Sequence, residues 1–151
     1  MSFLRAMQEE NLSEKWGGFN MVSKIFHLED SQQWRNYVSS ALGSERGIRL
    51  RQFGCLADFY KSPDILADLY ILDRHLPFER DGNIDDKNWV RFVKYMADIN
   101  VNLPIVILSG RAPEDGEWRR FSNVRASIPK QGLAVEDFKY IVFDVLVGGR
   151  R

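Results

Sequence analysis

Five side chains in this sequence have the types and positions needed for chemistry on a phosphate group. Each closes a short, largely apolar segment of the chain: Glu29, Asp30, Asp73, Ser109 and Lys130. Three acids held close together raise one another's pKa, and a divalent cation relieves that conflict. Oxygen ligands with open positions suit Mg²⁺, while an ammonium and a hydroxyl can hold an oxyanion. The pattern indicates phosphoryl transfer to a carboxylate, driven by positioning and charge neutralisation.

Short strands are expected to carry these residues. Apolar runs predict strands over 24–28, 48–53, 69–72, 105–108 and 125–128. The second of these alternates, with Ile48 and Leu50 on one side and Arg49 and Arg51 on the other, which is typical of a strand near a sheet edge. The continuous runs 69–72 and 105–108 suit central strands that are covered on both faces.

Helical periodicity fills the intervals between the strands. Apolar residues recur at spacings of three and four over 31–42, 55–60, 86–99, 114–121 and 134–147, the fourth being the weakest. Asp30 or Ser31 is expected to cap the first helix, and Asp85 or Asp86 the third, because a short polar side chain accepts from free backbone N–H groups. Trp34 and Trp89 are interpreted as core residues of these helices.

Five repeats of strand and helix predict an α/β fold. Strands joined by helical crossovers run parallel, and right-handed crossovers place helices on both faces of the sheet. The expected architecture is a three-layer α/β/α sandwich around a five-stranded parallel sheet. Ligands of such folds bind beyond the carboxyl ends of the strands, where the five candidate residues lie.

Composition limits the class of protein. The 151 residues include 21 Lys+Arg and 21 Asp+Glu, so the formal net charge is zero and nucleic acid is not an expected partner. One cysteine excludes an internal disulfide. No apolar run approaches the roughly 20 residues of a membrane span, and residues 1–21 lack the apolar stretch of a signal peptide. We expect a cytoplasmic protein with no membrane association.

The chain is expected to form a single domain. Residues 1–21 are polar and mixed, and we interpret them as an extension that precedes the domain. The domain itself is predicted over 22–147, and residues 148–151 form a C-terminal tail. One domain is what a chain of this length favours.

Four motifs resemble the receiver domain of two-component response regulators, the CheY-like family. "IFHLEDS" resembles the first strand with its acidic pair, and "LYILDRHLP" the strand with the phospho-accepting aspartate. "LPIVILSG" and "ASIPKQG" are similar to the strands that end in a hydroxyl residue and a lysine. Asp30 and Asp73 are 43 residues apart, Asp73 and Ser109 are 36 apart, and Ser109 and Lys130 are 21 apart. The four motifs in this order form a strong joint signal.

This resemblance implies a strand order of 2-1-3-4-5 and a role for each candidate residue. Asp73 would accept a phosphoryl group from the phosphohistidine of a sensor histidine kinase or phosphotransfer protein. Asp30, Asp73 and the backbone carbonyl of His75 would bind Mg²⁺, and Glu29 would act through a metal-bound water. Lys130 would pair with the phosphoryl oxygens.

Ser109 would hydrogen-bond the phosphoryl oxygens and shift a surface recognised by an unidentified downstream protein. Such a domain is a signalling switch and not an enzyme with a separate substrate. A homodimer through the face from the strand 105–108 to the helix 134–147 is also possible within this resemblance.

Two departures from the family keep an alternative open. The family usually places proline after the lysine, whereas Pro129 precedes Lys130 here, and Ser127 stands where an aromatic residue is usual. These differences favour a receiver-like interaction module that does not switch. A phosphatase of the haloacid dehalogenase type uses similar residues, but its nucleophile comes first, with a second Asp two residues later; here that position is His75.

Overall fold

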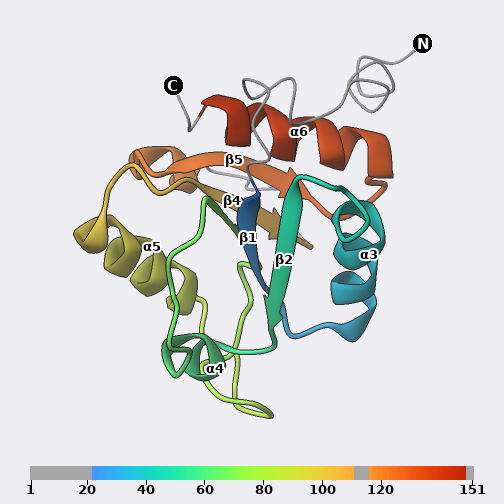
Figure 1. Cartoon of the computed structure of the whole chain (residues 1–151). Coiled ribbons are helices and arrows are strands. Elements are labelled where there is room, and N and C mark those ends of the chain that lie inside the picture. Colours follow the sequence, from blue (N-terminus) through green and yellow to red (C-terminus); the bar gives the residue numbers. More distant parts are fainter. Residues whose placement is uncertain (1–21, 111–115, 149–151) are drawn as a thin grey trace.

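A single parallel sheet organises the chain, as the strand pattern predicts. The computed structural model describes residues 22–110 and 116–148. The sheet order is β2-β1-β3-β4-β5, and every pairing is parallel. The strands are β1 (Ser23–Leu28), β2 (Ile48–Phe53), β3 (Leu69–Leu72), β4 (Ile105–Ser109) and β5 (Val124–Pro129). The predicted α/β class and strand order 2-1-3-4-5 are confirmed (Figure 1).

Helices cover both faces of this sheet and complete the three layers. They are α3 (Gln32–Leu42), α4 (Leu56–Tyr60), α5 (Asn88–Ile99) and α6 (Val135–Gly148). Helices α3 and α6 lie on one face, whereas α4 and α5 lie on the other (Figure 1). In the part of the chain that the structure describes, none of the helices has the length and apolar character needed to cross a lipid bilayer.

The crossover from β4 to β5 differs from the sequence prediction. Only a short 3₁₀ helix, η1 (Glu117–Arg120), lies within the predicted helix 114–121. Gly116 precedes it with φ 61°, in the left-handed region that ends or interrupts a right-handed helix. Residues 114 and 115 lie outside the described residues. The weak apolar periodicity of this segment gives little area to bury, so a longer helix gains little by forming here.

The two predicted helix caps have different outcomes. Ser31 is the N-cap of α3, and its Oγ accepts from the backbone N–H of Trp34 at 3.4 Å. Helix α5 begins later than predicted, at Asn88, with Lys87 at the cap position. The Asp85 carboxylate accepts from the backbone N–H of Lys87 at 2.9 Å, so it closes a turn before the helix instead of capping it.

Alternation along the central strands builds two separate cores. In β3, Leu69 and Ile71 face α3 and α6, while Tyr70 and Leu72 face α4 and α5. All four side chains are fully buried. The sheet therefore carries apolar residues on both faces, which explains why the sequence of this strand is continuously hydrophobic.

The core beneath α4 and α5 is rich in aromatic rings. Phe59 of α4 is fully buried and packs edge-on against Phe26, Phe53, Tyr70 and Phe92, with ring centroids 5.3 to 6.3 Å apart. Edge-to-face pairs of this kind add to the stability that burial supplies. This cluster fixes the short helix α4 against the strands.

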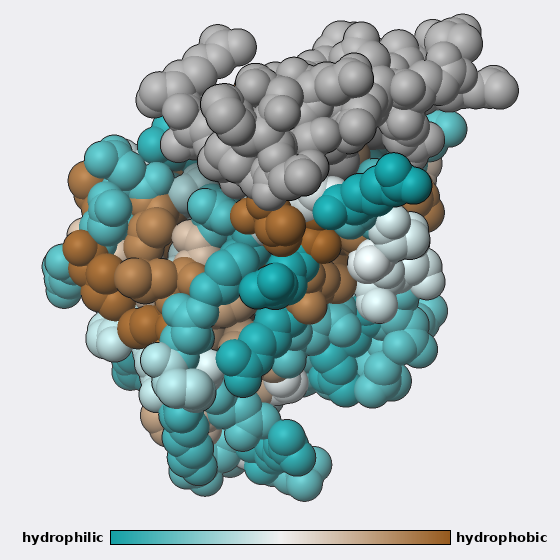
Figure 2. All heavy atoms as spheres, in the orientation of Figure 1, coloured by the Kyte–Doolittle hydropathy of each residue, from teal (hydrophilic) through white to brown (hydrophobic). Residues whose placement is uncertain are grey.

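The edge strand agrees with the sequence prediction, whereas the predicted start of the C-terminal tail differs from the structure by one residue. Among residues 22–110 and 116–148, β2 pairs only with β1, and its Arg49 and Arg51 are exposed, as predicted for an edge strand. Gly148, predicted to begin the tail, is the last residue of α6. The predicted extension 1–21 and the rest of the tail, 149–151, lie outside the described residues. Figure 2 shows hydrophilic residues over much of the face around β2.

We expect Phe59→Ala to lower the free energy of unfolding by about 3–5 kcal/mol, because it removes a buried ring and leaves a cavity. Phe78→Ala is the matched control, since Phe78 is 49% exposed, and its cost should stay below about 1 kcal/mol. Urea unfolding followed by circular dichroism measures both. Equal losses in the two variants would contradict the assignment of Phe59 to the core.

Candidate functional site

Parallel pairing brings the predicted acids to one edge of the sheet. Leu28 of β1 lies opposite Leu72 of β3, so Glu29 and Asp73 follow at the same level. Their backbone amides confirm the arrangement: Asp73 N donates to the Leu28 carbonyl at 3.0 Å, and Glu29 N donates to that of Phe53 at 2.9 Å. The register of the sheet thus fixes the backbone positions of Glu29 and Asp73.

Glu29, Asp30 and Asp73 form a compact acidic cluster. One carboxylate oxygen from each lies within 4.8 Å of the others. Glu29 and Asp73 are buried, at 0% and 3% exposure, whereas Asp30 is exposed. The cluster therefore has two acids inside the protein and one open to solvent.

Lys130 supplies the opposing charge. Its Nζ lies 2.5 Å from Glu29 Oε1 and 3.7 Å from Asp73 Oδ1, and its side chain is 11% exposed. The backbone N–H of Lys130 donates to the Ser109 carbonyl at 2.7 Å, which ties the end of β5 to the end of β4. The reversed order of Pro129 and Lys130 does not prevent the ammonium from reaching the acids.

The chemistry of the donor set fits a divalent cation. Burial first, and the nearby Asp73 second, raise the pKa of Glu29 to about 9, although Lys130 acts in the opposite direction. One lysine therefore offsets only part of the repulsion between the two buried carboxylates. A cation with oxygen ligands would relieve it, and Mg²⁺ keeps waters in such a site because it accepts few protein ligands.

The remaining predicted residues surround this cluster. Ser109 is the last residue of β4, is 1% exposed and lies opposite Pro129 of β5. The backbone N–H of His75 donates to Asp73 Oδ1 at 3.2 Å. The imidazole of His75 instead pairs with Asp86, with Nδ1 and Oδ1 3.2 Å apart. All five residues singled out from the sequence, together with His75, therefore belong to the same end of the sheet.

His27 belongs to the core, as expected for a histidine within a strand. It is fully buried, and its Nδ1 lies 3.1 Å from the Gln52 amide nitrogen. Burial first, and Lys130 second, lower its pKa to about 3, so the ring is neutral. Its Nε2 has no hydrogen-bond partner among the described residues.

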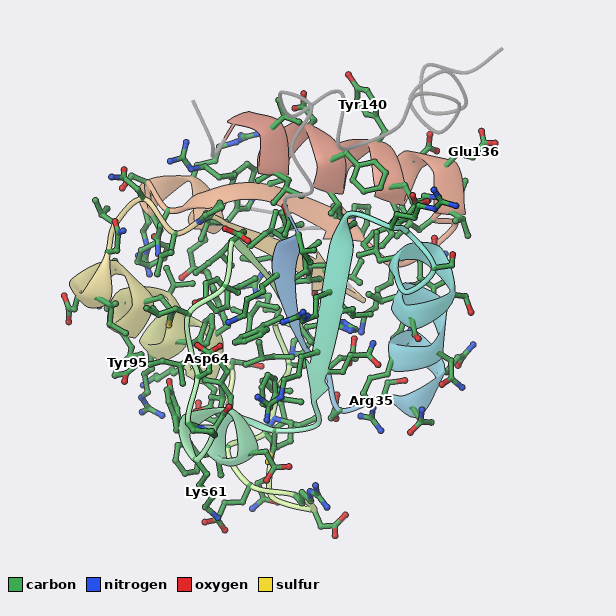
Figure 3. The ribbon with its side chains drawn as sticks, in the orientation of Figure 1. Arg35, Lys61, Asp64, Tyr95, Glu136 and Tyr140 are labelled. Atoms are coloured by element: carbon green, nitrogen blue, oxygen red, sulfur yellow. The ribbon has the colours of Figure 1, made fainter. Side chains whose placement is uncertain are left out.

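Two residues near the site were not predicted to belong to it. Arg35 Nη1 donates to the Glu29 carbonyl at 2.7 Å and anchors the segment that carries the acids. Figure 3 labels this side chain at the lower end of α3, the end at which β1 and β2 finish. Trp34 lies against Lys130, with Nζ 5.2 Å from the ring centroid. Spacing could have indicated Arg35, which lies in the first turns after the acidic pair.

The loop after β3 forms a wall beside the acids. Pro77 and Ile84 make an isolated antiparallel bridge, which folds the charged segment between them into a turn. A cleft of about 700 Å³ opens between this turn and the ends of β1 and β2, and its lining includes Asp30, Arg35, Gln52, Pro77, Arg80 and Ile84. Of the three acids, Asp30 is the one that lines this cleft.

Comparison with solved structures identifies the arrangement. The beryllofluoride-activated DrrB receiver domain superposes with a TM-score of 0.67 at 17% identity, covering 84% of this chain and 99% of that one. A CheY-like receiver domain protein from Methanospirillum hungatei gives 0.66 at 14% identity, covering 85% and 97%. The HemR receiver domain from Leptospira biflexa gives 0.64 at 20% identity, covering 82% and 94%.

The chain has the receiver-domain fold. The resemblance drawn from the four motifs is confirmed at the level of the fold. A scan against protein-family models finds no match, and no curated protein matches the chain. The acidic cluster of Glu29, Asp30 and Asp73 lies at the carboxyl edge of this receiver-domain sheet.

Mg²⁺ is expected to bind at the acidic cluster and to stabilise the protein. At ten times its Kd, a cation that binds only the folded chain adds about 1.4 kcal/mol to the free energy of unfolding. Asp30→Asn should reduce this gain because it removes a charged oxygen ligand. Asp144→Asn, an exposed change on α6, should keep it. Urea unfolding with and without Mg²⁺ measures the gain, and an equal gain in both variants would place the cation elsewhere.

Proposed function

We propose that this receiver domain accepts a phosphoryl group on Asp73 and acts as a switch in two-component signalling. The observation that carries the proposal is the placement of Asp73 at the end of the central strand, inside a cluster of two further acids and one lysine. A structural acid would gain nothing from two carboxylate neighbours, because like charges raise the cost of ionisation.

The proposed step is a displacement at phosphorus. An oxygen of the ionised Asp73 attacks the phosphorus of a phosphohistidine, the O–P bond forms, and the P–N bond to the imidazole breaks. The released imidazole takes a proton from solvent. Because the attacking atom is already a carboxylate oxygen, no side chain needs to remove a proton from it. Positioning and charge stabilisation then supply most of the rate.

Each neighbour has a part in this proposal. Asp30, Asp73 and the His75 carbonyl would hold Mg²⁺, Glu29 would act through a water, and the bound cation would supply positive charge toward the phosphoryl oxygens. Lys130, already 3.7 Å from Asp73, pairs with a phosphoryl oxygen. Ser109 donates its hydroxyl to another, and Gly110 leaves the approach open on the side of the described residues, none of which has an atom within 4 Å of a Cβ built there.

The partner that fits this chemistry is a sensor histidine kinase or a phosphotransfer protein. The cleft beside Asp30 is the route by which a phosphohistidine can approach. The downstream partner is a protein that distinguishes the phosphorylated surface from the unphosphorylated one. The face from β4 to α6 remains our prediction for self-association, and light scattering before and after phosphorylation measures it.

A non-switching interaction module is the second candidate. Ser127, a partly exposed residue of β5, cannot supply the ring that couples to the hydroxyl residue in the family this chain resembles. Under this alternative the fold and the acids persist, but the phosphoryl group changes no surface. Amide chemical shifts with and without beryllofluoride and Mg²⁺ separate the two, because a switch moves signals beyond the site itself.

Acetyl phosphate with Mg²⁺ is expected to add one phosphoryl group to the wild-type chain. Asp73→Asn should abolish the adduct, because an amide oxygen is a far poorer nucleophile than a carboxylate. Asp144→Asn should keep it. Intact-protein mass spectrometry reads out all three, and an adduct that survives Asp73→Asn would contradict the assignment of the acceptor.

Lys130→Ala is expected to slow phosphorylation by acetyl phosphate about a hundredfold, the cost of removing one preorganised group that stabilises developing charge. Lys94→Ala, an exposed change on α5, should leave the rate within about twofold. Rates come from quenched samples resolved by mass. A wild-type rate in the Lys130 variant would show that this ammonium takes no part.

A further inference from the structure

The ammonium of Lys130 lies between the acids and an aromatic ring. Trp34 of α3 is partly buried, and Lys130 Nζ is 5.2 Å from its ring centroid. The ring faces attract a cation at this range, and more strongly when the cation is shielded from water. Since only 11% of the lysine side chain is exposed, this contact acts with little competition from solvent.

Hydrogen bonds hold the backbone of Lys130, but they do not fix the direction of its ammonium. Pro129 fixes the residue before the lysine, while Gln131 and Gly132 follow it, and Gly132 has φ 68°. The ammonium is carried on a flexible stem of four carbons, so its position depends on contacts. Glu29 and Asp73 provide them on one side, and Trp34 provides one on the other.

Trp34 is itself held in place. Its ring centroid is 4.8 Å from that of Tyr37, one turn later on α3. The Tyr37 hydroxyl donates to the Leu133 carbonyl at 3.1 Å, and the N–H of Leu133 donates to the Lys130 carbonyl at 3.2 Å. One hydrogen bond, from Tyr37 to Leu133, and the cation contact thus join the helix with the aromatic pair to the loop with the lysine, and the Leu133–Lys130 bond closes the loop itself.

We propose that Trp34 is the positioning residue for Lys130 and holds its ammonium toward the phosphoryl group on Asp73. This inference rests on the proposed function and deepens it. The ring attracts the cation without neutralising it, so the ammonium keeps its full charge for a phosphoryl oxygen. Without the ring, the ammonium keeps its contacts with Glu29 and Asp73 but loses the one that holds it from the side of α3.

The kinetic test compares substitutions that differ in what they keep at position 34. Trp34→Ala and Trp34→Leu remove the π face, the second while filling space, and each should lower the rate of phosphorylation at saturating acetyl phosphate about tenfold. Trp34→Phe keeps a ring and should recover the rate to within about threefold. The concentration of donor that gives half the maximal rate should be unchanged in all three.

A double-mutant cycle shows whether the ring acts through the lysine. In a Lys130→Met background, Trp34→Leu should cause no further loss, because its partner is already absent. Trp118→Leu, whose ring lies against Arg119, is the matched control and should leave the rate unchanged. A tenfold loss from Trp34→Leu in both backgrounds would overturn the proposal.

A structural signal tests the contact without phosphorylation. Ring currents of Trp34 should move the Cε protons of Lys130 upfield of those of the other lysines, with Lys130→Met assigning the signal. The shift should persist in Trp34→Phe and vanish in Trp34→Leu. If the wild type accepts no phosphoryl group, the proposed function fails. The ring-current signal then decides alone whether Trp34 holds the Lys130 ammonium. A signal unchanged in Trp34→Leu, or an unchanged phosphorylation rate in that variant, overturns the inference.

Discussion

The balance of charge at the carboxyl edge of the sheet is the constraint on which the rest depends. Two buried acids lie side by side because their strands are paired in register, and one ammonium, 2.5 Å from Glu29, compensates them. Burying an uncompensated charge costs several kcal/mol. The fold therefore needs Lys130 at this place even before any ligand binds, and the same need keeps the ammonium beside the proposed acceptor.

The sheet meets this requirement through its topology. The acids follow β1 and β3, which are neighbours at the centre, and the lysine follows β5 at the far edge. The Lys130 N–H bond to the Ser109 carbonyl and the long lysine stem close the remaining distance. The apolar side chains on both faces exclude water from beneath the cluster, which strengthens each of its interactions.

The strand pattern predicted the parallel sheet and the clustering of the five residues, because the carboxyl ends of parallel strands meet at one edge, whereas the strand order was implied by the resemblance to the receiver-domain family. The sequence was less informative where alternative local conformations differ little in free energy. The helix over 114–121 reduces to η1 because Gly116 takes a left-handed conformation and the segment has little apolar area to bury. Trp34 was assigned to the core alone. Periodicity shows which face of a helix is apolar, but it does not show which charged group from a distant strand will contact that face.

The edge strand β2 also affects how copies of this molecule can associate. An open strand offers unpaired backbone groups to any extended peptide, and fibrous self-assembly can begin there. Arg49 and Arg51 are exposed along it, and the Arg51 guanidinium lies 4.9 Å from the Phe53 ring. The positive charges of these arginines on two copies of β2 repel each other and oppose pairing of the two backbones. The two arginines therefore disfavour edge-to-edge pairing of two copies along β2.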